Sequence, residues 1–147
     1  MSSAIEGLAD AASIIAVIQV ANRILTLCRN YALAVKDAKK DIERLMTEVA
    51  SLDNVLKRVD GMAKSDAMNL YISHSVVKEL GGTIRGCRST LCELEAQLDP
   101  GKRHKLMSHF GIRALKWPFK SKDVINIIET LNRHKCTIIL ALNLDQR

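Results

Sequence analysis

Four stretches of the chain carry hydrophobic residues at helical spacing, and none alternates with the period of two that a strand requires. The clearest is residues 34–61, where apolar positions follow one another at intervals of three and four residues over about four heptads. These positions are Val35, Ala38, Ile42, Leu45, Val49, Leu52, Leu56 and Val59. The pattern predicts an amphipathic helix over 34–61 that Gly61 ends.

Residues 67–98 repeat the same spacing and stop before the turn sequence Asp99-Pro100-Gly101. The apolar positions are Val77, Leu80, Ile84, Cys87, Leu91, Leu94 and Leu98. Three glycines, at positions 81, 82 and 86, weaken this predicted helix and indicate either a kink or a close approach of a neighbouring helix. The sequence GGTIRGCR is faintly similar to a phosphate-binding loop, but Cys87 stands where that loop needs lysine, and the context is helical, so we reject this interpretation.

Residues 121–143 predict a further helix, with Ser121 as its N-cap and Asp123 in its first turn. One side is apolar, and further apolar residues broaden it. They are Val124, Ile128, Leu131, Ile138 and Leu142, with Ile125, Ile127, Ile139 and Leu140 beside them. So wide an apolar face predicts that this helix is central in the fold.

The opening helix, predicted over 4–29, contains a stretch from Ala11 to Asn22 without any charge. A helix that is apolar on all sides is typical of the buried centre of a bundle, and periodicity alone favours that interpretation. The alternative is a membrane-active segment. Ala11–Asn22 would span about 18 Å as a helix, short of the roughly 30 Å hydrocarbon core, so only several copies together could cross a bilayer. Small residues four apart would allow close helix contact. They are Gly7 with Ala11 and Ala12 with Ala16.

With a shorter amphipathic helix near 102–115, these elements predict an all-α fold: an up-down four-helix bundle forming one domain over 1–147. Aromatic residues are few, so the core is expected to be aliphatic. The four cysteines form no metal-binding or disulfide pattern, and we expect small buried residues in a reducing compartment. No secretory signal or ordinary membrane span is evident, which predicts a cytosolic protein.

The net charge of +6 is concentrated between residues 101 and 122, where seven basic residues occur without an acid. They are Lys102, Arg103, Lys105, Arg113, Lys116, Lys120 and Lys122, interleaved with Phe110, Trp117 and Phe119. Basic and aromatic residues together suit the headgroup layer of an anionic membrane. Two alternatives remain: the aromatic residues pin this connection to the end of the bundle, or the basic residues bind nucleic acid. The second is disfavoured because no helix-turn-helix or stacking platform accompanies them.

No catalytic motif is present, so we predict no enzyme activity, no metal and no cofactor. The histidines are predicted on exposed faces or in the basic segment, without partners at ligand spacing. They are His74, His104, His109 and His134. The acids within 34–61 alternate with lysine and arginine, which is typical of a solvated helix face.

Three blocks of the sequence resemble the HeLo-like N-terminal domains of fungal STAND proteins, the counterparts of NOD-like receptors. The blocks are AASIIAVIQVANRIL, DIERLMTEVASLDNVLKRV and LKWPFKSKDVINIIETLNRHKCTIILALNLD. The last is the most specific, with Trp117, a short basic stretch, and a helix carrying Leu131, Lys135 and Leu142. The resemblance implies a four-helix bundle like that of mixed-lineage kinase-like proteins. It also implies a role in programmed cell death, in which clustered copies release the N-terminal helix into a membrane.

On this resemblance, we expect a membrane-targeting effector of a fungal innate immunity system, cytoplasmic at rest and membrane-associated when activated. It would be either a domain of a longer NLR-type receptor or a separate protein. Expected partners are further copies of the chain in a homo-oligomer, an anionic phospholipid membrane, and an upstream NLR-type NTPase or amyloid-type trigger; nucleic acid is not expected. The alternative is a signalling adaptor or homo-oligomerisation module without membrane activity.

The expectation assigns roles to particular residues. Membrane insertion is expected of Ile5, Leu8, Ile14, Ile15, Val17, Ile18 and Leu25, and close helix packing of Gly7, Ala11, Ala12 and Ala16. Lipid headgroups are expected to meet Lys102, Arg103, Lys105, Arg113, Lys116, Lys120 and Lys122, with Phe110, Trp117 and Phe119 at the membrane interface.

Overall fold

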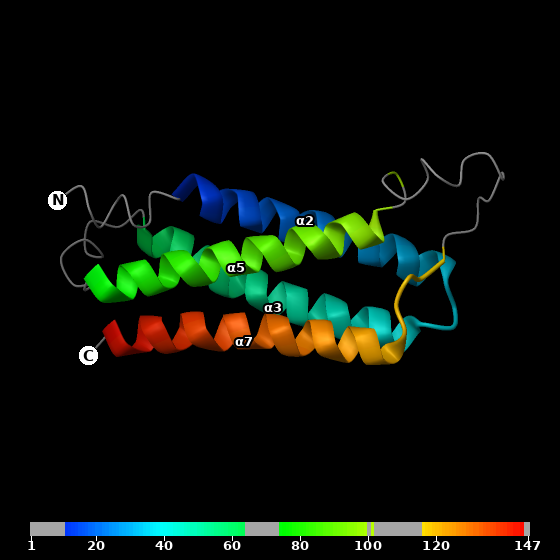
Figure 1. The fold of residues 1–147 in the computed structure, drawn as a ribbon. Helices are drawn as coiled ribbons and strands as arrows, with labels where there is room; N and C mark the ends of the chain where they lie inside the picture. Colours follow the sequence, from blue (N-terminus) through cyan, green and yellow to red (C-terminus); the bar gives the residue numbers. More distant parts are fainter. Residues whose placement is uncertain (1–10, 64–73, 100, 102–115, 146–147) are drawn as a thin grey trace.

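The computed structural model describes residues 11–63, 74–99, 101 and 116–145. Within these ranges the chain forms four long helices and no strand, which confirms the predicted all-α class for this part of the molecule. The helices are α2 (Ala11–Ala34), α3 (Lys39–Ala63), α5 (His74–Leu98) and α7 (Ser121–Asp145) (Figure 1). The short helix predicted near 102–115, and the predicted helical residues before Ala11 and before His74, lie outside the described residues.

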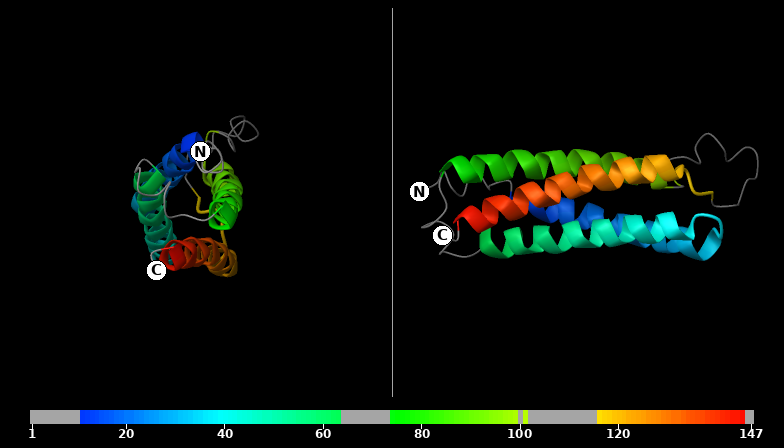
Figure 2. Two further views of the ribbon diagram at one scale, coloured as in Figure 1. Left: turned by 90° about the vertical axis from the view of Figure 1, so that its left-hand side faces the viewer. Right: turned by 90° about the horizontal axis from the view of Figure 1, so that it is seen from below.

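The helices form a four-membered bundle in which α2 packs on α3 and α5, and α7 packs on the same two helices. The end-on view of Figure 2 shows them at four corners, with α2 opposite α7 and α3 opposite α5. In Figure 1, α2 and α5 run in one direction and α3 and α7 run in the other. The consecutive helices α3 and α5 are not among the main packing pairs, so α2·α5 and α3·α7 are parallel neighbours.

The heptad positions form the aliphatic core. Of the eight positions predicted over 34–61, the six that lie on α3 are fully buried, and on α5 all six predicted positions whose side chains are described are buried. The buried residues are Ile42, Leu45, Val49, Leu52, Leu56 and Val59 on α3, and Leu80, Ile84, Cys87, Leu91, Leu94 and Leu98 on α5. Val35 and Ala38 are partly buried and pack against this core. The described part of the bundle therefore uses the apolar faces that the spacing predicted.

Three predictions about the helices are wrong. Helix α7 is not central: it occupies one corner, and Ile125 and Leu140 are 47% and 61% exposed. Gly61 does not end α3, which continues to Ala63. The acids of α3 do not all lie on a solvated face, because Asp53 is 4% exposed and its Oδ2 lies 2.9 Å from Lys57 Nζ.

Each parallel pair of helices carries a partly buried ion pair. Between α2 and α5, the Arg23 guanidinium donates to the carboxylate of Glu95, which is buried, and this hydrogen bond raises the pKa of Arg23. Between α3 and α7, Lys135 Nζ lies 3.2 Å from Glu48 Oε1 and donates to Ser51 Oγ at 3.2 Å. A buried charge without its partner is strongly destabilising, so these pairs disfavour other arrangements of the same helices.

The cysteines divide into two kinds. Cys28 and Cys87 are buried as predicted, and burial raises the pKa of each thiol to about 12. Cys92 and Cys136 are exposed, which the sequence interpretation missed, and all four are free. Burial was expected because each cysteine lies within a predicted helix, but membership of a helix does not establish which face of it a residue occupies.

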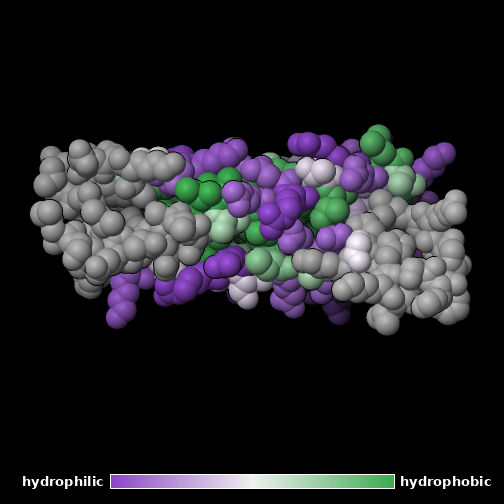
Figure 3. Space-filling view, turned by 90° about the horizontal axis from the view of Figure 1, so that it is seen from above, coloured by the Kyte–Doolittle hydropathy of each residue, from purple (hydrophilic) through white to green (hydrophobic). Residues whose placement is uncertain are grey.

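Seen from the side of α2 and α5, the surface is a mixture of polar side chains with apolar ones showing between them along the length of the bundle (Figure 3). Four large hydrophobic residues are exposed among the described ones: Ile15, Leu33, Ile125 and Leu140. No helix in the described ranges combines the length and the apolar character needed to cross a membrane.

Candidate functional site

Three aromatic rings meet at the end of the bundle where α2 and α5 end and α7 begins. Tyr31, in the last turn of α2, is fully buried, and its hydroxyl donates a 2.6 Å hydrogen bond to the carbonyl oxygen of Leu98. Trp117 lies edge-on to Tyr31 with ring centroids 5.3 Å apart, and Phe119 lies edge-on to Trp117 at the same distance. Both Trp117 and Phe119 pack against the core. The cluster thus joins the ends of α2 and α5 to the start of α7, as the pinning alternative predicted.

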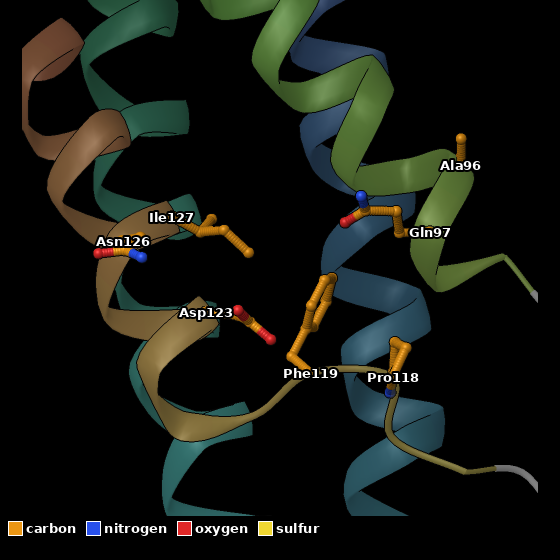
Figure 4. Close-up of a pocket in the computed structure, with 7 residues that line it drawn as sticks. All are labelled: Ala96, Gln97, Pro118, Phe119, Asp123, Asn126 and Ile127. Atoms are coloured by element: carbon orange, nitrogen blue, oxygen red, sulfur yellow. The ribbon is translucent and has the colours of Figure 1, made fainter.

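A groove opens beside this cluster between α5 and α7, with a volume of 690 Å³. Figure 4 shows the Phe119 ring standing between Gln97 of α5 and Asp123 of α7. Asp123 accepts a 3.0 Å hydrogen bond from the backbone N–H of Lys120, which fixes the first turn of α7. A second cavity, of 260 Å³, continues the groove along the same two helices. The two cavities share Gln97, Asn126 and Ile127.

The described lining of this groove is amphipathic and acidic. Leu94, Phe119 and Ile127 supply apolar contact, while Glu93 and Asp123 supply carboxylates, and none of the described lining residues is basic. These groups can form hydrogen bonds and apolar contacts with a peptide-like partner. Among the residues that the structure describes, no group of histidine, cysteine, aspartate and glutamate could hold a metal ion.

His134 lies in the contact between α5 and α7, where the sequence interpretation had placed it on an exposed face. Its Nε2 is 3.3 Å from the Thr90 hydroxyl. A Cβ built on Gly86 would come within 3.0 Å of its Cε1, so the glycine makes room for the ring. Burial, with a smaller effect of Arg133, lowers the pKa of His134. Gly86 indicated in the sequence that a neighbouring helix approaches closely, and the structure identifies His134 as the side chain that packs against it.

The described residues predicted to insert into a membrane differ in their burial on α2. Ile14 and Val17 are in the core, and Ile18 and Leu25 are half-buried against it. Ile15 is 40% exposed. Ile5, Leu8 and Gly7 lie outside the described residues, as do the side chains of Ala11 and Ala12; Ala16 is half-buried.

Among the predicted headgroup contacts, three lysines are described, and all three are exposed: Lys116, Lys120 and Lys122. They lie where α7 begins, at the end of the bundle opposite the first residues of α2 (Figure 1). A helix as long as α2 measures about 36 Å, so the two predicted membrane contacts are far apart. Lys102, Arg103, Lys105, Arg113 and Phe110 lie outside the described residues.

The structure adds basic residues that the sequence interpretation did not single out. Lys36, Lys39 and Lys40 are exposed at the start of α3. The Ser121 hydroxyl donates a 2.7 Å hydrogen bond to Asp41 Oδ2, which places the start of α3 beside the start of α7. Because these lysines alternate with acids along the chain, the net charge of the segment did not single them out in the sequence.

A model of one protein family matches residues 5–145, and its description is PigL_N, pigment biosynthesis cluster protein PigL N-terminal. No curated protein and no solved structure matches the chain.

Proposed function

The chain belongs to the family of PigL N-terminal domains, and from this premise we propose that its bundle is a HeLo-like effector domain that clusters and inserts α2 into membranes. The family description links its namesake to a pigment biosynthesis cluster and assigns no activity to the N-terminal part. The proposal therefore depends on the residues of this chain. It includes cytoplasmic residence at rest, membrane association on activation, and a role in cell death.

The observation that carries the proposal is the excess of apolar surface on α2. Residues 11–22 contain no charge, although only one side of the described part of this stretch is needed for the core. Ile15 is 40% exposed, and Ile18 is half-buried. A helix of this kind packs against its sister helices, and in hydrocarbon it would pack against further copies of itself.

Release of α2 has a cost that clustering must offset. Each buried aliphatic side chain such as Ile14, Val17 or Ile24 contributes about 1.5–3 kcal/mol to docking. Because no described helix is suited to span a bilayer alone, several copies are needed to form a stable inserted state. The upstream NTPase or amyloid-type element is proposed as the source of that clustering.

Dye release from vesicles tests this proposal, with phosphatidylserine-containing vesicles compared with phosphatidylcholine vesicles. The variant Ile15→Glu places a charge on the exposed face of α2, and Ile125→Glu places one at a similarly exposed position of α7. We expect leakage from the anionic vesicles by the unaltered protein and by Ile125→Glu, and its loss in Ile15→Glu. Background leakage by the unaltered protein at every protein-to-lipid ratio would contradict the proposal, as would full leakage by Ile15→Glu.

A second candidate function is that of an adaptor or homo-oligomerisation module without membrane activity. The acidic, partly apolar groove between α5 and α7 favours it, because such a surface suits a helical peptide of a partner. Under this function, light scattering would show a defined oligomer or complex while vesicle leakage stayed at background.

A further inference from the structure

The end of the bundle at which α2 stops presents the most exposed large hydrophobic residue of the described chain. Leu33 is 88% exposed, against 40% for Ile15, 47% for Ile125 and 61% for Leu140. It lies in the last turn of α2, and the exposed Ala34 follows it. A single exposed leucine is ordinary on a protein surface, so its meaning depends on what surrounds it.

Lysines lie at this end of the bundle in the two segments that lead into α3 and α7. Lys36, Lys39 and Lys40 follow Leu33 along the chain, and all three are exposed. Lys116, Lys120 and Lys122 come from the start of α7, which the contact between Ser121 and Asp41 holds beside α3. These six lysines face three aspartates in the same segments, Asp37, Asp41 and Asp123, which leaves a positive surplus.

The leucine is presented on a rigid support. Tyr31, two residues before it, is fully buried and anchored to Leu98, and its ring packs against Trp117. The helical hydrogen bonding continues past Leu33, because the Val35 N–H donates to the Tyr31 carbonyl oxygen at 2.8 Å. Leu33 is therefore fixed in position at the end of the bundle, since the residues on both sides of it are held.

An exposed apolar side chain at the same end of the bundle as six exposed lysines matches the chemistry of an anionic bilayer surface, where headgroups attract the lysines and the layer beneath accepts the leucine. Duplex nucleic acid offers the charge without the apolar layer. We propose that the end of the bundle that carries Leu33 and these six lysines docks on anionic phospholipid, with the Leu33 side chain entering the headgroup region. This inference depends on the proposed function and adds a docking face distinct from the start of α2.

Co-sedimentation of the full chain with phosphatidylserine-containing vesicles tests the proposal. The test variant is Leu33→Ser and the matched control is Leu140→Ser, since Leu140 is an exposed leucine near the opposite end of the bundle. Leu33→Met retains an apolar side chain. We expect Leu33→Ser to weaken vesicle binding about tenfold, and Leu140→Ser and Leu33→Met to bind as the unaltered protein does. Circular dichroism and thermal unfolding check that all three remain folded.

The outcomes separate this inference from the proposed function. If the unaltered protein binds anionic vesicles and Leu33→Ser binds equally well, the proposed docking face is refuted, while the proposed membrane function is not. If the unaltered protein binds no anionic vesicle at low salt, both are overturned. Binding to duplex DNA in preference to the vesicles would also overturn the inference.

Discussion

The hydroxyl of Tyr31 and the carbonyl oxygen of Leu98 are 2.6 Å apart, although 67 positions separate the two residues in the sequence. This hydrogen bond is buried and fixes the last turn of α2 against the last turn of α5. In the other half of α2, which contains the exposed Ile15, the described residues before Arg23 form no such polar anchor to another helix. If α2 leaves the bundle, its early residues are therefore expected to separate first and the Tyr31 turn last.

Removal of the Tyr31 hydroxyl should destabilise the bundle. Tyr31→Phe leaves the buried Leu98 carbonyl without this donor, which costs about 1–3 kcal/mol. Urea unfolding followed by circular dichroism measures the change. Thr47→Val serves as the control, because the Thr47 hydroxyl is exposed and donates only to Glu43 within its own helix. Equal stabilities of Tyr31→Phe and the unaltered protein would refute the anchoring role.

The ion pair between α2 and α5 should also contribute to stability. Arg23→Met removes the guanidinium from the buried Glu95 carboxylate, and because the Arg23 side chain is 55% exposed the expected cost is reduced to about 1–2 kcal/mol. The same unfolding experiment on Glu93→Gln, which alters an exposed carboxylate of the same helix, should show a change within about 0.5 kcal/mol. If the free energy of unfolding falls no further in Arg23→Met than in this control, the ion pair contributes nothing to stability.

Acidification should weaken the contact between α5 and α7 through His134. Burial lowers the pKa of this histidine in the folded protein, so the unfolded chain binds the proton more readily. Stability is therefore expected to fall as the pH drops below about 6.5, the ordinary histidine value, until the folded pKa is passed. Chemical unfolding at a series of pH values measures this slope. His134→Gln should reduce this slope, whereas His74→Gln tests whether the loss of another histidine reduces it equally.

Two glycines of α5 should respond to alanine with opposite signs. Gly82 faces open surface, with its nearest neighbour atom at 3.9 Å, so Gly82→Ala should stabilise the helix by up to about 1 kcal/mol. At Gly86 a Cβ would lie 3.0 Å from His134 Cε1 and would displace the ring from Thr90. Gly86→Ala should therefore lower the thermal unfolding midpoint while Gly82→Ala raises it. Equal increases in both variants would show that the His134 ring moves freely.

Much of the core could be predicted from sequence because the spacing of aliphatic residues identifies the buried face of each helix. The α3 positions from Ile42 to Val59 illustrate this, since all six are fully buried. Spacing does not identify the neighbour on which that face packs. The diagonal placement of α3 and α5 and the ion pair of Arg23 with Glu95 therefore escaped prediction.

The candidate site was less predictable for the same reason. Trp117 and Phe119 were singled out as aromatic residues in a basic segment, but Tyr31, on which the Trp117 ring packs, lies more than 80 positions away. His134 was predicted to be exposed because periodicity gives only its angle around its own helix. It does not reveal Gly86, which faces the His134 ring from α5. Leu33 carried no signal, because it lies between the helices predicted over 4–29 and 34–61, where spacing assigns no buried or exposed face.

Hydrogen exchange of the full chain, with and without phosphatidylserine-containing vesicles, tests whether α2 moves from the bundle into the membrane. Under conditions in which the vesicles leak, we expect altered exchange of the amides of residues 11–22, together with faster exchange in the parts of α3 and α5 that α2 covers. Exchange that is identical across all three helices while the same vesicles leak would show that α2 stays in the bundle and would refute the proposed insertion.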